Sequence, residues 1–114
     1  MEKTKIALIG HKGKMGSLVF EALKNDYQVV GIERGESVDK QSQIVIDFGS
    51  AESSVEIAKV CAEKKLPLII GSTGQNQSQL EIIKNAALST PILMSGNFSM
   101  GINYLKKSYY SVTI

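Results

Sequence analysis

Apolar residues fall into five short runs along the chain, and each run is nearly continuous rather than alternating with polar residues. Runs of this kind are typical of strands that are buried on both faces, as in a parallel sheet. The predicted strands are Lys5–Ile9, Gln28–Glu33, Ile44–Phe48, Leu66–Ile70 and Pro91–Met94. We therefore expect one sheet whose strands are joined by crossover connections.

Helical spacing of apolar residues fills three of the intervals between these strands. The predicted helices are Ser17–Leu23, Ala51–Lys64 and Gln79–Leu88. Ser50 is expected to cap the second helix, and Ser78 and Glu81 have the spacing of a capping box at the start of the third. Strands that alternate with helices indicate an α/β protein with a Rossmann-like, doubly wound and mostly parallel sheet in a three-layer α/β/α arrangement.

The connection between the second and third strands departs from this alternation. It runs from Arg34 to Gln43, contains Gly35, Ser37 and Asp39, and shows no helical period. Ten residues are close to the minimum for a crossover. We expect an irregular link there, and therefore a trimmed version of the fold.

Composition and charge exclude several classes of function. The chain has 114 residues, of which 43% are hydrophobic and 21% charged, as in a single soluble globular domain. A net charge of +2 with scattered lysines does not favour a nucleic acid or a membrane as the partner. Cys61, the only cysteine, is interpreted as a core thiol. We recognise no signal peptide, membrane span or metal site, and we expect a cytoplasmic protein.

The segment Ile6 to Gly16 carries the strongest chemical signal. The first strand leads into Gly10, Gly13 and Gly16, and a helix follows at once. Such a turn lets the backbone approach a diphosphate, while the helix N-terminus supplies free N–H groups and partial positive charge. Lys12 stands where the usual pattern has its second glycine, and glycine turns without a ligand are common. Glu33 lies about twenty residues further on, where a carboxylate binds the adenosine ribose.

The ends of the predicted strands share a second pattern. Asp47-Phe48-Gly49 follows the third strand, Gly71-Ser72-Thr73-Gly74 the fourth, and Ser95-Gly96-Asn97-Phe98-Ser99 the fifth. Ligands of open α/β sheets bind beyond the carboxyl ends of the strands. The sequence therefore predicts a dinucleotide site along this edge.

Four elements together resemble one enzyme family. They are Gly10-x-x-Gly13-x-Met15-Gly16, Val45-Ile46-Asp47-Phe48, Gly71-Ser72-Thr73-Gly74 and Asn97-Phe98-Ser99-x-Gly101-x-Asn103. In their order and intervals, over nearly the whole chain, they look like 4-hydroxy-tetrahydrodipicolinate reductase, formerly dihydrodipicolinate reductase, of the bacterial diaminopimelate and lysine pathway. The resemblance implies an NADH- or NADPH-dependent reductase, with hydride transfer from the nicotinamide to a small cyclic dicarboxylate.

The resemblance also implies roles for individual residues. Glu33 would contact the adenosine ribose and Arg34 a 2′-phosphate, while Thr73 and Gly74 would face the substrate. The remaining cofactor-binding residues implied for the diphosphate loop and the nicotinamide end are Gly10, Lys12, Gly13, Lys14, Met15, Gly16, Asp47, Phe48, Gly71, Thr73, Asn97 and Phe98.

The family's His-His-x-x-Lys motif, in a separate tetramer-forming substrate domain, has no counterpart here, because His11 is the only histidine. We therefore interpret residues 1–114 as the NAD(P)-binding domain alone, without catalytic residues, and expect the full-length enzyme to be a homotetramer. Two alternatives stay open. One is another dehydrogenase such as aspartate or homoserine dehydrogenase, against which the Asn97-Phe98-Ser99 loop argues. The other is a stand-alone dinucleotide-binding or redox-sensing module.

Overall fold

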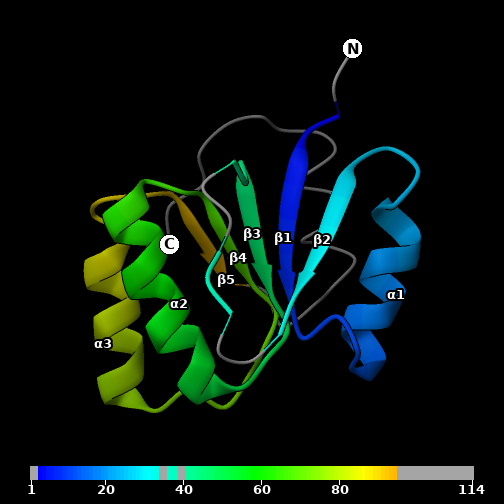
Figure 1. The fold of residues 1–114 in the computed structure, drawn as a ribbon. Helices are drawn as coiled ribbons and strands as arrows, with labels where there is room; N and C mark the ends of the chain where they lie inside the picture. The colour runs from blue at the N-terminus through cyan, green and yellow to red at the C-terminus, as the bar shows by residue number, and fades with distance from the viewer. Residues whose placement is uncertain (1–2, 34–35, 39–40, 95–114) are drawn as a thin grey trace.

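The five predicted strands and three predicted helices are all present in a computed structural model, which describes residues 3–33, 36–38 and 41–94. In chain order the elements are β1 Lys5–Ile9, α1 Lys14–Leu23, β2 Gln28–Ile32, β3 Ile44–Asp47, α2 Ala51–Lys64, β4 Leu68–Ile70, α3 Gln77–Ala86 and β5 Ile92–Met94. Every strand pairing is parallel, and the strand order is β2-β1-β3-β4-β5 (Figure 1). The Rossmann-like fold expected from the sequence is confirmed.

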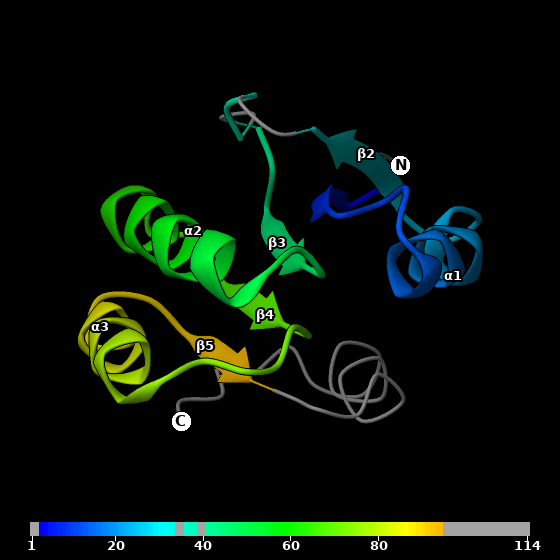
Figure 2. The same ribbon diagram turned by 90° about the horizontal axis from the view of Figure 1, so that it is seen from below.

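The helices cover both faces of the sheet, so the molecule has three layers. Helix α1 lies on one face, and α2 and α3 lie side by side on the other (Figure 2). The core beneath α1 is built from Ile6, Leu8, Val19, Leu23 and Ile46. The core beneath α2 and α3 is larger and includes Ala7, Val45, Ala58, Cys61, Leu68, Ile70, Ile83 and Ile92. Successive residues of β1 and β3 alternate between these two cores, which explains why both strands read as continuous apolar runs.

The helix starts differ from the predicted ones in two places. Helix α1 begins at Lys14 rather than Ser17, so the last glycine of the loop lies inside the helix. Helix α3 is capped by Asn76, whose side chain accepts from the Gln79 N–H at 2.9 Å while the Gln79 side chain accepts from Asn76 N–H. The predicted capping box of Ser78 and Glu81 is therefore wrong, because the same polar spacing occurs two residues earlier.

Ser50 caps helix α2 as predicted, accepting from the Ser53 N–H at 3.1 Å. In the three described helices, no segment is both long enough and apolar enough to cross a membrane.

The link between β2 and β3 contains no helix or strand in its described residues 36–38 and 41–43, in agreement with the irregular link that was predicted. Val38 is buried in the same core as Ala58 and Cys61, and its carbonyl oxygen accepts from Lys64 Nζ at 3.2 Å. Val38 therefore helps to cover the α2 side of the sheet, next to a link whose described residues form no helix. Cys61 is fully buried and has a free thiol, which confirms its interpretation as a core residue.

Candidate dinucleotide-binding site

The loops that follow β1, β2, β3 and β4 leave the sheet at one edge, the lower edge in Figure 1. The strand order reverses between β1 and β3, because β1 connects outward to β2 while β3 leads on to β4 and β5. In open α/β sheets a crevice forms at such a reversal, and ligands bind in it. The glycine loop after β1 and the Phe48–Gly49 segment after β3 flank this position.

The glycine loop is held by contacts between its own backbone groups. Gly10 has a φ of +82°, a left-handed conformation that favours glycine, and its carbonyl oxygen accepts from the Gly13 N–H at 3.0 Å. A Cβ on Gly16 would lie 2.6 Å from the Gly10 carbonyl carbon and 3.0 Å from His11 Cα, and closer still to the Gly10 oxygen. Since these are backbone atoms, the fold itself requires glycine at positions 10 and 16.

Gly13 differs from these two glycines. Its φ is −75°, and a Cβ there would come no nearer than 3.4 Å to the Gly10 oxygen, which is an ordinary contact. Gly13 is the N-cap of α1, and no side chain caps this helix. The first-turn N–H groups have no intrahelical acceptors, and the helix dipole makes this end partly positive. The missing side chain at Gly13 therefore leaves a positive helix end open to an approaching anion.

Phe48 connects the loops after three different strands. A Cβ on Gly10 would lie 2.7 Å from the Phe48 carbonyl oxygen, and a Cβ on Gly71 would lie 2.6 Å from Cζ of the Phe48 ring. The Phe48 N–H also donates to the Ile9 carbonyl oxygen at 2.9 Å. The structure thus brings together Gly10, Phe48 and Gly71, three of the predicted site residues, through close backbone and ring packing.

Lys12 and Glu33 form an ion pair between the glycine loop and the end of β2. The hydrogen bond and the charge of Lys12 lower the pKa of Glu33, and the same interactions raise the pKa of Lys12. Both side chains are exposed, so the pair is available to a ligand. The Glu33 N–H donates to Glu36 Oε1 at 2.7 Å. The predicted ribose carboxylate and the predicted loop lysine therefore meet at the same end of the site.

Asp47 is the last residue of β3 and is fully buried on the α2 side of the sheet. Its Oδ1 accepts from the Gly49 N–H at 2.7 Å, whereas Oδ2 has no hydrogen-bond partner among the described residues. Burial raises the pKa of this carboxyl group from 3.8 to about 6. This hydrogen bond fixes the turn on either side of Phe48, so Asp47 helps to position Phe48 in the site.

The loop between β4 and α3 carries Gly71, Thr73 and Gly74 to the same edge. Gly74 has a φ of +92°, and no atom would lie within 4 Å of a Cβ there. Thr73 and Gly74 are exposed, while Gln75 anchors the loop by donating to Ser72 Oγ at 3.1 Å and Ser54 Oγ at 3.2 Å. Three further predicted site residues, Arg34, Asn97 and Phe98, lie outside the described residues.

Sequence reasoning missed one residue of this edge, His11. Its ring lies over β2, where a Cβ on Gly31 would be 2.5 Å from His11 Cγ, Cδ2 and Nδ1. The available signal was Gly31 itself, because an isolated glycine inside a strand indicates the close approach of another group.

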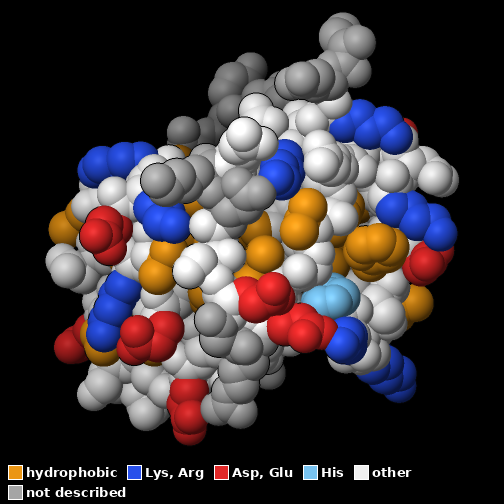
Figure 3. All heavy atoms as spheres, in the orientation of Figure 1, with side chains coloured by type: hydrophobic (Ala, Val, Ile, Leu, Met, Phe, Trp, Pro, Cys, Tyr) orange, Lys and Arg blue, Asp and Glu red, His pale blue; other side chains and the backbone are white. Residues whose placement is uncertain are grey.

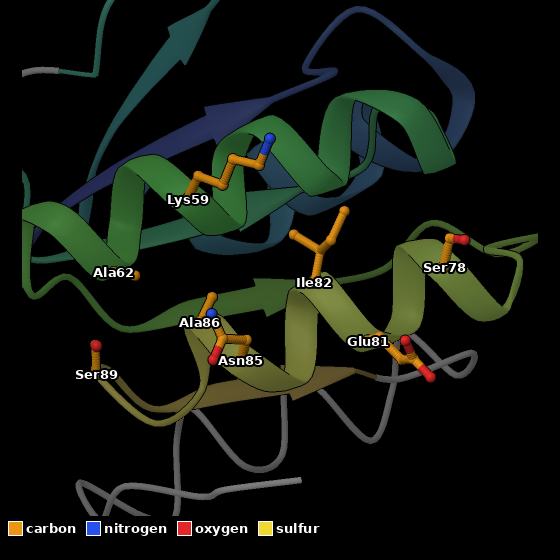
Figure 4. Close-up of a pocket in the computed structure, with 8 residues that line it drawn as sticks. All are labelled: Lys59, Ala62, Ser78, Glu81, Ile82, Asn85, Ala86 and Ser89. Carbon is orange, nitrogen blue, oxygen red and sulfur yellow. The ribbon is translucent and has the colours of Figure 1, made fainter.

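A separate hollow of about 730 Å³ lies between α2 and α3, away from the glycine loop (Figure 4). Ile82 points from α3 toward α2, and Lys59 and Glu81 add one charge of each sign. None of the predicted site residues lines this hollow.

The fold is Rossmann-like, with a glycine loop before α1 and an exposed carboxylate after β2, which is the arrangement typical of dinucleotide-binding domains. Residues 28–98 match the family described as dihydrodipicolinate reductase, N-terminus, and the chain belongs to this family. Membership in the family indicates a nicotinamide cofactor for the site.

Individual relatives agree with this assignment. The 4-hydroxy-tetrahydrodipicolinate reductase of Alkaliphilus oremlandii is 37% identical over 88% of this chain and 44% of its own length. Among solved structures, a dipicolinate-bound dihydrodipicolinate reductase from Paenisporosarcina has a TM-score of 0.69 at 16% identity, over 89% of this chain and 49% of its own, which shows the same fold. The Staphylococcus aureus homoserine dehydrogenase has a TM-score of 0.65 at 17% identity, over 83% of this chain and 33% of its own, which reflects the shared fold alone. The chain spans about half the length of the curated relatives it matches.

Proposed function

We propose that this chain is the NAD(P)H-binding domain of a 4-hydroxy-tetrahydrodipicolinate reductase. In the full-length enzyme, a cytoplasmic homotetramer, the nicotinamide passes a hydride to a cyclic dicarboxylate in lysine and diaminopimelate biosynthesis. The observation that carries the proposal is the glycine loop at the strand reversal. Two of its glycines are required by the fold, and the third leaves the N-terminus of α1 uncovered.

Different described residues along this edge would bind different parts of the cofactor. The first-turn N–H groups of α1, with Lys14 and Met15, would hold the diphosphate at the positive helix end. Gly71 and the Phe48 ring that packs on it would border the nicotinamide end, and Thr73 with Gly74 would face the substrate. These residues bind and orient, while the nicotinamide supplies the hydride chemistry.

The adenosine end explains how either NADH or NADPH could be accepted. Glu33 can accept hydrogen bonds from two ribose hydroxyls, which suits NADH, whereas a cation beside it can bind the 2′-phosphate of NADPH. Lys12 already lies against Glu33, and Arg34 follows it in the sequence. With both charges present we expect the two affinities to agree within roughly tenfold. Replacing Arg34 by Ala should weaken NADPH by roughly 1.5–3 kcal/mol and leave NADH little changed.

The diphosphate assignment is tested by calorimetric titration of the purified chain with NADH and NADPH. Gly13→Val should weaken both cofactors by at least about tenfold, because its side chain blocks backbone approach to the diphosphate. Ala22→Val, which places the same side chain on an exposed position near the other end of α1, is the matched control and should bind normally. Normal binding by a folded Gly13→Val chain would show that the loop is not the phosphate site.

The proposal also separates binding from turnover. The sequence contains no counterpart of the histidine and lysine pair that the family uses, so the chain should bind the cofactor without reducing the substrate. A coupled reductase assay on the purified chain checks this expectation. Measurable turnover would contradict the assignment of catalysis to a separate domain.

A further inference from the structure

The His11 side chain packs against Gly31 of β2, at the adenosine end of the proposed site. Any side chain at Gly31 would collide with the imidazole, since a Cβ there would lie 2.5 Å from three of its ring atoms. A glycine inside a strand weakens the strand and packs nothing of its own. The packing of the His11 ring therefore explains why β2 contains glycine at position 31, and it holds the ring beside the end of that strand.

The ring nitrogens of His11 make no hydrogen bond to any residue that the structure describes, although the side chain is half-buried. Among the residues that the structure describes, Lys12 on the same loop and Glu33 after β2 are the charged groups beside it, and Glu36 interacts with Lys12. The charge of His11 contributes to lowering the pKa of Glu33. Figure 3 shows the one histidine at the surface beside acidic and basic side chains. Two ring nitrogens thus remain available to a ligand that binds beside Glu33.

We propose that His11 makes the choice between NADPH and NADH depend on pH, because its protonated ring attracts the 2′-phosphate that only NADPH carries. The inference rests on the proposed function and deepens it. A charge on His11 would add to that of Lys12 beside Glu33, and a hydrogen bond from a charged imidazole to a phosphate oxygen is of the strong kind.

Histidine is the residue type that changes charge between pH 5 and 8, whereas the neighbouring ion pair stays charged. Lys12 holds the pKa of Glu33 below its usual range, and Glu33 holds that of Lys12 above its usual range. The 2′-phosphate of the cofactor and the carboxyl group of Asp47 change charge near pH 6. The 2′-phosphate loses charge in acid, which opposes the expected trend, and Asp47 has a pKa of about 6 but lies buried on the α2 side. Both are present in every His11 variant, so a comparison between variants removes their effects.

The experiment measures the dissociation constants of NADP⁺ and NAD⁺ for the purified chain at pH 5.8 and pH 8. The oxidised cofactors are used because they carry the same adenosine half and survive in acid. His11→Asn supplies a neutral side chain that fits the space over Gly31, and His11→Arg supplies a permanent charge. Circular dichroism confirms that each variant is folded.

We expect the preference of the wild-type chain for NADP⁺ over NAD⁺ to rise in acid by about threefold or more relative to His11→Asn, as one added charge allows. His11→Arg should keep the stronger preference at both pH values. Equal pH dependence in wild type and His11→Asn would overturn the inference and leave the proposed function standing. Binding of neither cofactor at either pH would overturn the proposed function, and this inference with it.

Discussion

Gly16→Ala should destabilise the whole domain, although alanine normally favours a helix. In the interior of an exposed helix, Ala is better than Gly by about 0.8–1.0 kcal/mol. Here the added Cβ would lie 2.6 Å from the Gly10 carbonyl carbon and 3.0 Å from His11 Cα, against ordinary carbon contacts of about 3.5–4.0 Å. Because both contacts are backbone atoms, helix α1 must retreat from the loop by roughly 1 Å.

That retreat disturbs packing as well as the loop. Val19 and Leu23 of α1 are fully buried against Ile6 and Leu8 of β1, so moving the helix opens the core beneath it. Overpacking of this kind costs about 1–3 kcal/mol and occasionally more, and the lost core contacts add to it. After subtracting the helix propensity gain, we expect a net loss of about 1–3 kcal/mol. For a domain of this size the melting temperature should fall by about 5–20 °C.

The assay is thermal and urea unfolding followed by circular dichroism, with Gly13→Ala as the matched control. A Cβ on Gly13 meets nothing closer than 3.4 Å, so this variant should lose less than about 1 kcal/mol, chiefly because Ala is a poorer N-cap than Gly. Gly16→Ala would then affect stability, and Gly13→Ala would affect cofactor affinity at nearly normal stability. A Gly16→Ala chain as stable as the wild type would refute the packing argument.

Three further outcomes follow from buried or capping groups. Asp47→Asn should raise the free energy of unfolding at pH 7.5 by roughly 1–3 kcal/mol. Folding raises the pKa of the Asp47 carboxyl group from 3.8 to about 6, so its charged form destabilises the folded state above that range, and the neutral Asn removes this cost. The difference in stability between Asp47→Asn and the wild type should shrink as the pH falls from about 6 to 4. If urea melts over this pH series showed a constant difference, the raised pKa of Asp47 would be contradicted. Asn76→Ala should lower the free energy of unfolding by about 1 kcal/mol and Ser78→Ala by much less, because Asn76 is the N-cap of α3. Thermal melts compare the two variants, and a larger loss for Ser78→Ala would show that Ser78 caps the helix instead. Cys61, whose pKa is raised to about 12 by burial, should react with a thiol reagent only after unfolding, and rapid labelling of the folded chain would exclude the buried position.

Patterns that depend on neighbouring residues could be predicted from the sequence. The strands, the three helices and the Ser50 cap follow from apolar periodicity and local hydrogen bonding, and the glycine loop follows from its place between β1 and α1. The boundaries were less accurate, because polar residues such as Asn76 and Ser78 compete to cap the same helix. The predicted start of α1 at Ser17 was late because Gly16 lowers helix propensity, while its packing on Gly10 favours the helix.

Contacts between distant segments could not be predicted in the same way. Nothing local to Val38 shows that it fills the core beneath α2, and nothing local to Phe48 shows that its ring lies on Gly71. The burial of Asp47 depends on the helix that packs over β3, whereas the sequence placed Asp47 at a strand end and its family resemblance implied a cofactor-binding residue there.

The central position of β1 has a consequence for how the chain folds. Of the five described strands β1 is synthesised before the others, yet its neighbours are β2 on one side and β3 on the other, with Ile6 aligned to both Val29 and Ile44. No strand can pair with the next one through a tight hairpin, so every sheet contact closes a long loop before it stabilises the structure. A nascent chain that ends before β3 therefore carries an apolar strand with one open edge, and such edges invite aggregation. Translation of the segment through Asp47 is the step that removes this exposure.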